Sequence, residues 1–239
     1  MKIQNSKYLF FTLIAGTALA SFVGTASAAI IQTDSYSGAG TSQTFYTVSS
    51  TDLVNQGEST FLSQDTTDFT SWSSDPASIL NDGAAGPGIA LDLADGTWTT
   101  TFNLNLSTNT LGYDITGVNT YAGWNDARVN QKYTLSYSTA AAPTTFLSLG
   151  TFTFKPLPSN IGDASTRVSL TEGTTGVLAT NVASIRFTFE EPTDAGDRTV
   201  YREVDVLGVA SVPEPSTFAM LLGGIGMLVG LRRMGSRRA

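Results

Sequence analysis

The sequence predicts an all-β fold, a β-sandwich of the jelly-roll type, placed between two apolar terminal segments. Three observations predict it. Residues 29–211 alternate apolar and polar side chains over short runs, as strands with one buried face do. Turn-forming residues separate these runs, for example at Asn81-Asp82-Gly83 and at Asp95-Gly96. Lys and Glu, which favour helices, are scarce there, whereas Thr and Ser are abundant.

The first 28 residues predict a secretory signal peptide. Lys2 and Lys7 supply the positive charge with which such peptides begin, and an apolar stretch follows them. Ala26-Ser27-Ala28 has the small-residue pattern of a cleavage site, so we expect signal peptidase to leave a mature chain that starts at Ala29. The other interpretation is an uncleaved N-terminal membrane anchor.

The middle of the chain, residues 29–211, is expected to form one domain. Residues 29–78 are interpreted as an N-terminal arm with the first strand or strands, and residues 79–211 as the core of the sandwich. Alternation predicts strands, in chain order, at 45–48, 89–93, 98–106, 113–121, 132–137, 146–154, 167–170, 185–189 and 200–206.

The C-terminal segment, 212–239, predicts a membrane-anchored precursor. Residues 212–216 (Val-Pro-Glu-Pro-Ser) precede 15 uncharged residues, 217–231, and a basic tail, 232–239. At about 1.5 Å per residue, a helix of that length spans about 22 Å, which makes it a short transmembrane helix for a hydrocarbon core of about 30 Å. The arginines of the tail favour the cytoplasmic side.

This C-terminal segment resembles a PEP-CTERM sorting signal. Pro213-Glu214-Pro215, a short glycine-rich apolar helix and terminal arginines follow one another in the order that such signals have. The resemblance implies that an exosortase, a membrane transpeptidase, recognises and removes the tail. It further implies a precursor held transiently in the inner membrane of a Gram-negative bacterium that makes extracellular polysaccharide, and a product at the cell surface or in the extracellular matrix.

Composition excludes several classes of site and partner. The chain has no Cys and no His, which excludes disulfides, thiolate or imidazole metal ligands and a Ser–His–Asp triad. Residues 29–211 contain 7 basic and 19 acidic residues, a net charge of −12. So acidic a domain is not expected to bind nucleic acid or anionic lipid, whereas neutral polysaccharide and divalent cations are compatible with it.

Residues 79–210 are similar to the galactose-binding-like jelly rolls of discoidin and coagulation-factor type C domains. The similarity lies in the turn Asn81-Asp82-Gly83 and in four strand segments, 113–121, 133–138, 184–189 and 201–208. It implies a Ca²⁺ ion held by Asp82 and Glu203, whose carboxylates are the hard oxygen ligands that Ca²⁺ prefers. In the alternative, Asp82 only shapes its turn and Glu203 pairs with an arginine, Arg186 or Arg202.

The segment Trp124-Asn125-Asp126-Ala127-Arg128 is a candidate sugar site. An aromatic ring can cover the apolar face of a sugar, while Asn125, Asp126 and Arg128 bond to its hydroxyls. The alternative is structural, with Trp124 capping the sandwich and Arg128 packed over its ring.

Together these features predict a non-catalytic module that binds extracellular polysaccharide or takes part in a biofilm. A purely structural coat or adhesion protein without a sugar pocket is the alternative. A polysaccharide hydrolase would need two carboxylates at a fixed separation, which the sequence does not place. Because no nucleophile elbow, P-loop or dinucleotide fingerprint is present, we predict that the protein is not an enzyme.

Overall fold

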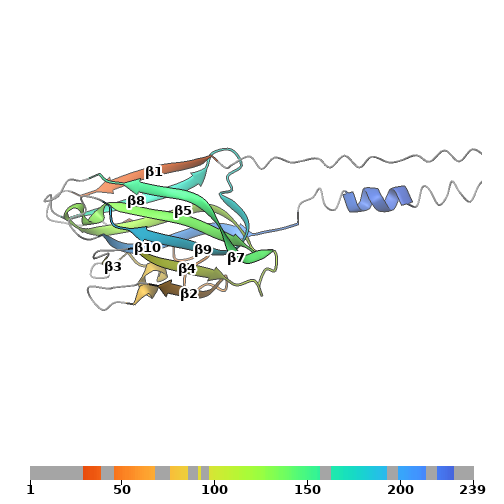
Figure 1. The fold of residues 1–239 in the computed structure, drawn as a ribbon, viewed down its shortest axis with the longest axis horizontal. Coiled ribbons are helices and arrows are strands. Elements are labelled where there is room, and N and C mark those ends of the chain that lie inside the picture. The colour runs from red at the N-terminus through yellow and green to blue at the C-terminus, as the bar shows by residue number, and fades with distance from the viewer. Residues whose placement is uncertain are drawn as a thin grey trace, which may run out of the picture.

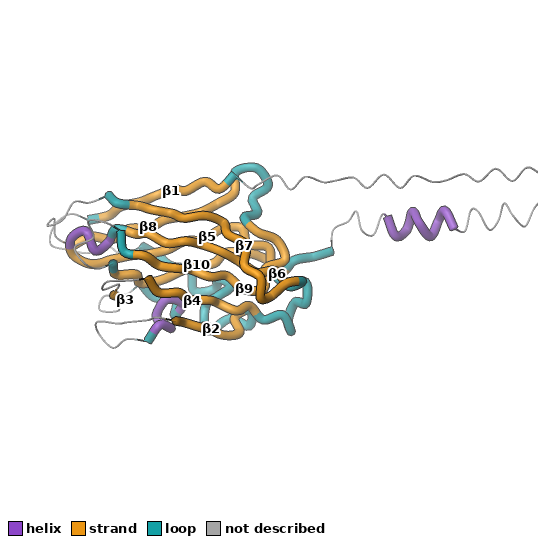
Figure 2. Tube along the Cα trace, viewed as in Figure 1, coloured by secondary structure: helices purple, strands orange, loops and turns teal. Residues whose placement is uncertain are grey.

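The computed structural model describes residues 29–38, 46–67, 76–85, 91–92, 97–156, 163–192, 199–213 and 220–228. The regular elements of these residues are strands, two short 3-10 helices and a helix over residues 220–228, with loops between them (Figure 2). The elements are β1 (Ile30–Ser37), β2 (Phe61–Thr67), η1 (Ala77–Asn81), β3 (Leu91–Asp92), β4 (Thr97–Leu104), β5 (Tyr113–Asn125), η2 (Asp126–Val129), β6 (Gln131–Thr139), β7 (Ala142–Phe154), β8 (Asp163–Glu172), β9 (Ala179–Glu190) and β10 (Val200–Ala210).

The strands form two antiparallel layers (Figure 1). One layer has the order β1-β8-β5-β10-β3 and the other β7-β6-β9-β4-β2. The layers join at one corner, where the start of β5 also pairs with β9 through Tyr113–Val182 and Ile115–Ala179. The chain changes layer between β4, β5 and β6, and again between β7, β8, β9 and β10. This alternation is the jelly-roll arrangement, so the predicted all-β sandwich is confirmed.

The core lies between the two layers because each strand turns its apolar residues inward. On β9, Phe187 and Phe189 are fully buried, whereas Arg186 and Thr188 between and beside them face outward. Phe189 stacks on Trp98 of the same layer, with ring centroids 4.1 Å apart, and contacts Tyr201 of the other layer at 4.3 Å. Aromatic rings therefore hold the two layers together.

Two features of residues 46–67 differ from the prediction. The pattern predicted a strand at 45–48, but residues 46–48 belong to an irregular segment that is hydrogen-bonded to β10. This segment is fixed by bonds from the Leu53 amide to the Val206 carbonyl, at 2.9 Å, and from the Ser49 amide to Asp205. Strand β2 was not predicted, because it is an edge strand whose residues are only partly buried and alternate weakly.

Much of the predicted targeting machinery lies outside the described residues. That holds for the signal peptide with its cleavage site, for Glu214 and Pro215, and for the basic tail. Within the predicted apolar stretch, residues 220–228 are helical. Across the described parts of the chain, no helix has both the length and the apolar character needed to cross a bilayer.

Candidate functional site

The outward face of the β2-β4-β9-β6-β7 layer carries polar side chains in register. Strand pairing aligns residues at the usual spacing of about 4.8 Å between neighbouring strands. One row has a threonine on each of the five strands: Thr67, Thr99, Thr188, Thr134 and Thr151. The next row contains Asp65, Thr101, Arg186 and Ser136. These two rows therefore offer a regular array of hydroxyl groups with one arginine and one carboxylate among them.

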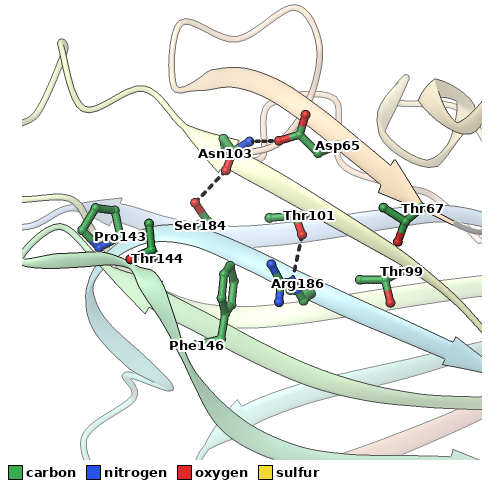
Figure 3. Close-up of a pocket in the computed structure, with 10 residues that line it drawn as sticks. All are labelled: Asp65, Thr67, Thr99, Thr101, Asn103, Pro143, Thr144, Phe146, Ser184 and Arg186. Carbon is green, nitrogen blue, oxygen red and sulfur yellow. Dashed lines mark hydrogen bonds between the residues drawn. The ribbon is translucent and has the colours of Figure 1, made fainter.

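A groove of about 560 Å³ lies on this face, where the beginning of β7 stands beside β9 and β4 (Figure 3). Its lining comes from four strands that are distant in sequence. Strands β4 and β9 contribute mainly hydroxyl and amide groups together with Arg186, β2 contributes Asp65, and β7 contributes the apolar Phe146. Such a mixture of polar groups and one aromatic ring is typical of a ligand site.

Arg186 is held firmly inside the groove. Its guanidinium carbon lies 3.5 Å from the centroid of the Phe146 ring, within the range of a cation–π contact. Its Nε donates a hydrogen bond of 3.0 Å to the hydroxyl of Thr101 on the neighbouring strand (Figure 3). The guanidinium is thus fixed both in its plane and above a ring.

Asn103 connects the polar groups at the other side of the groove. Its amide nitrogen donates to Asp65 at 2.7 Å, and its carbonyl oxygen accepts a 2.7 Å bond from the Ser184 hydroxyl (Figure 3). The amide nitrogen also donates to the Ser63 hydroxyl at 3.0 Å. This network fixes donors and acceptors on three adjacent strands. Asp65 is the only acid among the described residues that line the groove. A pair of carboxylates for glycoside hydrolysis is therefore not present in that lining.

The predicted sugar residues around Trp124 lie away from this groove. Trp124 is near the end of β5 and pairs with Ala164 on β8. The guanidinium of Arg202 lies 5.9 Å from the centroid of the Trp124 ring, and its Nε donates to the Gly123 carbonyl at 2.6 Å. The side chains of Asn125 and Asp126 are outside the described set, and Arg128 is on η2. A sugar site at this end of the sandwich stays a prediction.

The two residues predicted to hold Ca²⁺ are brought close together. The Gly83 amide, one residue after Asp82, donates a 3.2 Å hydrogen bond to Glu203, while Asp82 itself accepts from the Ala84 amide and shapes the turn. Glu203 is fully buried, and its Oε2 has no hydrogen-bond partner. Glu203 cannot pair with Arg186, because Arg186 lies in the groove of the opposite layer.

Two further buried acids, Asp52 and Asp205, lie near Glu203. The Val54 and Val206 amides donate to Asp52, and the Tyr121 hydroxyl donates to Asp205 at 2.7 Å. Each acid also has one oxygen without a partner. Burial is the main cause that raises the pKa of Glu203 to about 10, that of Asp52 to about 6, and that of Asp205 above its usual value. In the described ranges, no three acidic, histidine or cysteine side chains are placed to share one metal ion.

The C-terminal segment begins where the sandwich ends. Strand β10 stops at Ala210, and the Ser211 amide donates to the Gly112 carbonyl at 3.0 Å. The chain then leaves the sandwich through Val212 and Pro213. Residues 211–238 match the PEP-CTERM protein-sorting motif. The predicted resemblance is thereby confirmed. The matched residues follow β10 without a linker, and the first of them, Ser211, is hydrogen-bonded to the β-sandwich.

Solved structures similar to this chain include carbohydrate-binding domains. A pectin-binding carbohydrate-binding module is 12% identical, with a TM-score of 0.39 over 64% of this chain and 94% of that one. The C-terminal domain of a chitobiase from Bacteroides fragilis is 17% identical, with a TM-score of 0.40 over 64% and 99% of the two chains. A chitosan-binding module of a Paenibacillus chitosanase/glucanase is 14% identical, with a TM-score of 0.31 over 66% and 98%. No curated protein matches the sequence.

The groove residues Asp65, Asn103, Phe146 and Arg186 were not predicted as a site. One signal for them existed in the sequence, because Asn103 and Arg186 occupy outward positions in strands that alternate clearly. That signal places each residue on the surface of the sandwich. It does not place the residues together, because alternation within each strand does not predict that the strands pair in the order β2-β4-β9.

Proposed function

We propose that the protein is an exported, non-catalytic module that binds polysaccharide at a bacterial surface or in the extracellular matrix. The observation that supports the proposal is the groove in which Arg186, stacked on Phe146, faces a fixed network of amide and hydroxyl groups. Sugars present hydroxyl groups on their edges and C–H groups on their faces. Such ligands are recognised by precisely placed polar groups beside an aromatic ring.

In the proposed mechanism, each copy of the protein binds the polymer weakly, and the display of many copies on one surface strengthens the binding. One groove open to solvent binds a short stretch of polymer, and many copies on one surface bind the same polymer at a high effective concentration. The PEP-CTERM motif supports such a display, because it marks the chain for sorting. On this basis we propose a role in a biofilm matrix.

Binding is expected to depend on the groove rather than on the end of the sandwich near Trp124. In Phe146→Ala, affinity for the polysaccharide should fall about tenfold, roughly 1.4 kcal/mol, because the ring and its hold on Arg186 are both lost. In Trp124→Ala, affinity should be unchanged. A glycan array followed by titration calorimetry measures both, with melting temperatures confirming that both variants are folded.

Loss of binding in Trp124→Ala but not in Phe146→Ala would instead place the ligand at the segment 124–128 that the sequence suggested. Absence of saturable binding by the wild-type chain to every glycan would leave the alternative, a purely structural coat or adhesion protein.

For sorting, we propose cleavage at both ends, by signal peptidase after Ala28 and by an exosortase near Glu214. The precursor is anchored transiently in the inner membrane through residues 217–231. In a host with an exosortase, mass spectrometry of the mature protein should find Ala29 at its N-terminus and no residues beyond the segment 212–216. Glu214→Ala should retain the tail and accumulate as precursor. A wild-type product that keeps its tail would contradict exosortase processing.

We further propose that Asp82 and Glu203 hold a Ca²⁺ ion. The unpartnered Oε2 of buried Glu203, next to the Asp82–Gly83 turn, supports this choice, as does the hard oxygen chemistry of both side chains. The ion would neutralise the buried carboxylate and connect the turn to β10. A test is developed in the Discussion.

A further inference from the structure

We propose that the ligand of the groove is an acidic polysaccharide, and that Arg186 binds the carboxylate of its sugar units. This inference rests on the proposed function and specifies the chemical class of the ligand. It begins from the state of Arg186 itself. The ion pair seen among the described residues joins Lys132 to Glu190 at 2.6 Å, and Arg186 pairs with no described carboxylate.

The free donors of Arg186 point to a planar anion. Its Nε is used in the bond to Thr101, and no described residue bonds to its two terminal amino groups. Those two groups form the outer edge of the guanidinium. A carboxylate matches such an edge with two parallel hydrogen bonds, which is the strongest common geometry for this pair.

The arginine is already in the position that binding requires. Phe146 covers one face of the guanidinium, and Thr101 fixes its orientation in the plane. An arginine on a flexible stem would lose side-chain entropy when it bound an anion, whereas one held in advance loses less. The groove thus presents a prearranged cation rather than a surface charge that happens to lie nearby.

Charge in the rest of the groove does not cancel that of Arg186. Asp65 is the acid of the lining, and it is engaged by Asn103 at 2.7 Å on the far strand of the groove. A neutral sugar would need only the hydroxyl and amide groups of the network. The unpaired guanidinium adds a preference for a ligand that brings a negative charge, in a domain whose other charges are mostly acidic.

The test compares acidic polymers with their neutral derivatives, using the full chain at about 0.15 M salt, where the Debye length of about 8 Å screens repulsion by the acidic domain. The probes are three polymers that contain uronate units, called polyuronates below: polygalacturonate and alginate, with a carboxylate on every sugar, and hyaluronate, with one on every second sugar. Methyl-esterified polygalacturonate is the neutral match, and dextran sulfate is the other anion. We expect at least one polyuronate to bind about tenfold more tightly than the esterified polymer and the sulfated one.

Variants then assign the preference to one side chain. Arg186→Gln should lose that tenfold preference for the acid, and Arg186→Lys should recover only part of it, since an ammonium lacks the planar edge. Lys132→Gln is the matched control, because it removes the same charge from the same face outside the groove lining. It should leave the preference intact.

Three results would overturn the inference: equal binding of esterified and free acid, equal losses in Arg186→Gln and Lys132→Gln, or tighter binding of dextran sulfate than of any polyuronate. If neutral glycans bind and Phe146→Ala abolishes that binding, the proposed function stands although the acidic ligand does not. If no glycan of either kind binds, both fail.

Discussion

Phe187→Ala is expected to lower the free energy of unfolding by about 3–5 kcal/mol, the usual cost of removing a large aromatic side chain from a packed core. Phe187 is fully buried on β9. It packs edge-on against Phe102, with ring centroids 6.0 Å apart, and lies 5.8 Å from Tyr133 and 5.5 Å from Phe189. Those rings belong to three adjacent strands and cannot all move to fill the void.

The matched control for that substitution is Leu62→Ala on β2. Leu62 is 61% exposed, so the change should stay within about 0.5 kcal/mol. Equilibrium denaturation in urea, followed by tryptophan fluorescence and circular dichroism, measures both. If the two substitutions lower the free energy of unfolding equally, Phe187 does not lie between two packed layers, and the β-sandwich fold is contradicted.

The inward position of Phe187 was predictable because alternation is a local property. In 185–189, every second residue is apolar, and the structure buries those residues while Arg186 and Thr188 face outward. The same pattern predicted the strands from β3 to β10. It failed at residues 46–48, which belong to a segment whose order depends on a distant contact, the bond between the Leu53 amide and the Val206 carbonyl. No local sequence pattern predicts that bond.

The candidate site was predictable in part and for a similar reason. The pairing of the Asp82 turn with Glu203 followed from resemblance to a known domain, which carries information about the whole fold. The groove depends on the alignment of Asp65, Thr101 and Arg186 across β2, β4 and β9. Thr101 and Arg186 are bonded although they are 85 positions apart. Period-2 patterning gives the face of each strand but not its neighbours.

Glu203→Gln is expected to raise the stability of the cation-free protein at pH 8. Burial, with the nearby charges of Asp82, Asp205 and Asp52 as smaller causes, raises the pKa of Glu203 to about 10. In the unfolded chain a glutamate has a pKa of about 4.3. Between these values the folded protein holds one more proton than the unfolded chain, so stability is complete at low pH and falls as pH rises. Glutamine keeps the shape of the neutral acid and cannot ionise.

The size of the effect follows from the same linkage. For one such group, each pH unit in this window lowers the free energy of unfolding by about 1.4 kcal/mol, and hydration of the ionised acid reduces the total loss. We expect the wild type to lose about 2–4 kcal/mol between pH 5 and pH 8, with Asp52, whose pKa is about 6, contributing in the lower half of the range. Glu203→Gln should remove most of that slope. Glu190→Gln, which changes a partly exposed carboxylate paired with Lys132, should leave it unchanged.

Calcium should offset most of this pH-dependent loss of stability if Asp82 and Glu203 bind it, because a cation and a proton compete for the same carboxylate. At pH 8, saturation at a hundred times the dissociation constant would add about 2.7 kcal/mol, and excess chelator would remove it. At pH 5 the same calcium should have little effect, and in Glu203→Gln none at either pH. A pH slope without a calcium response would refute the cation site and leave the buried acid in place. A wild type whose stability is flat from pH 5 to pH 8 would instead show that Glu203 is hydrated, which removes the reason for placing an ion beside it.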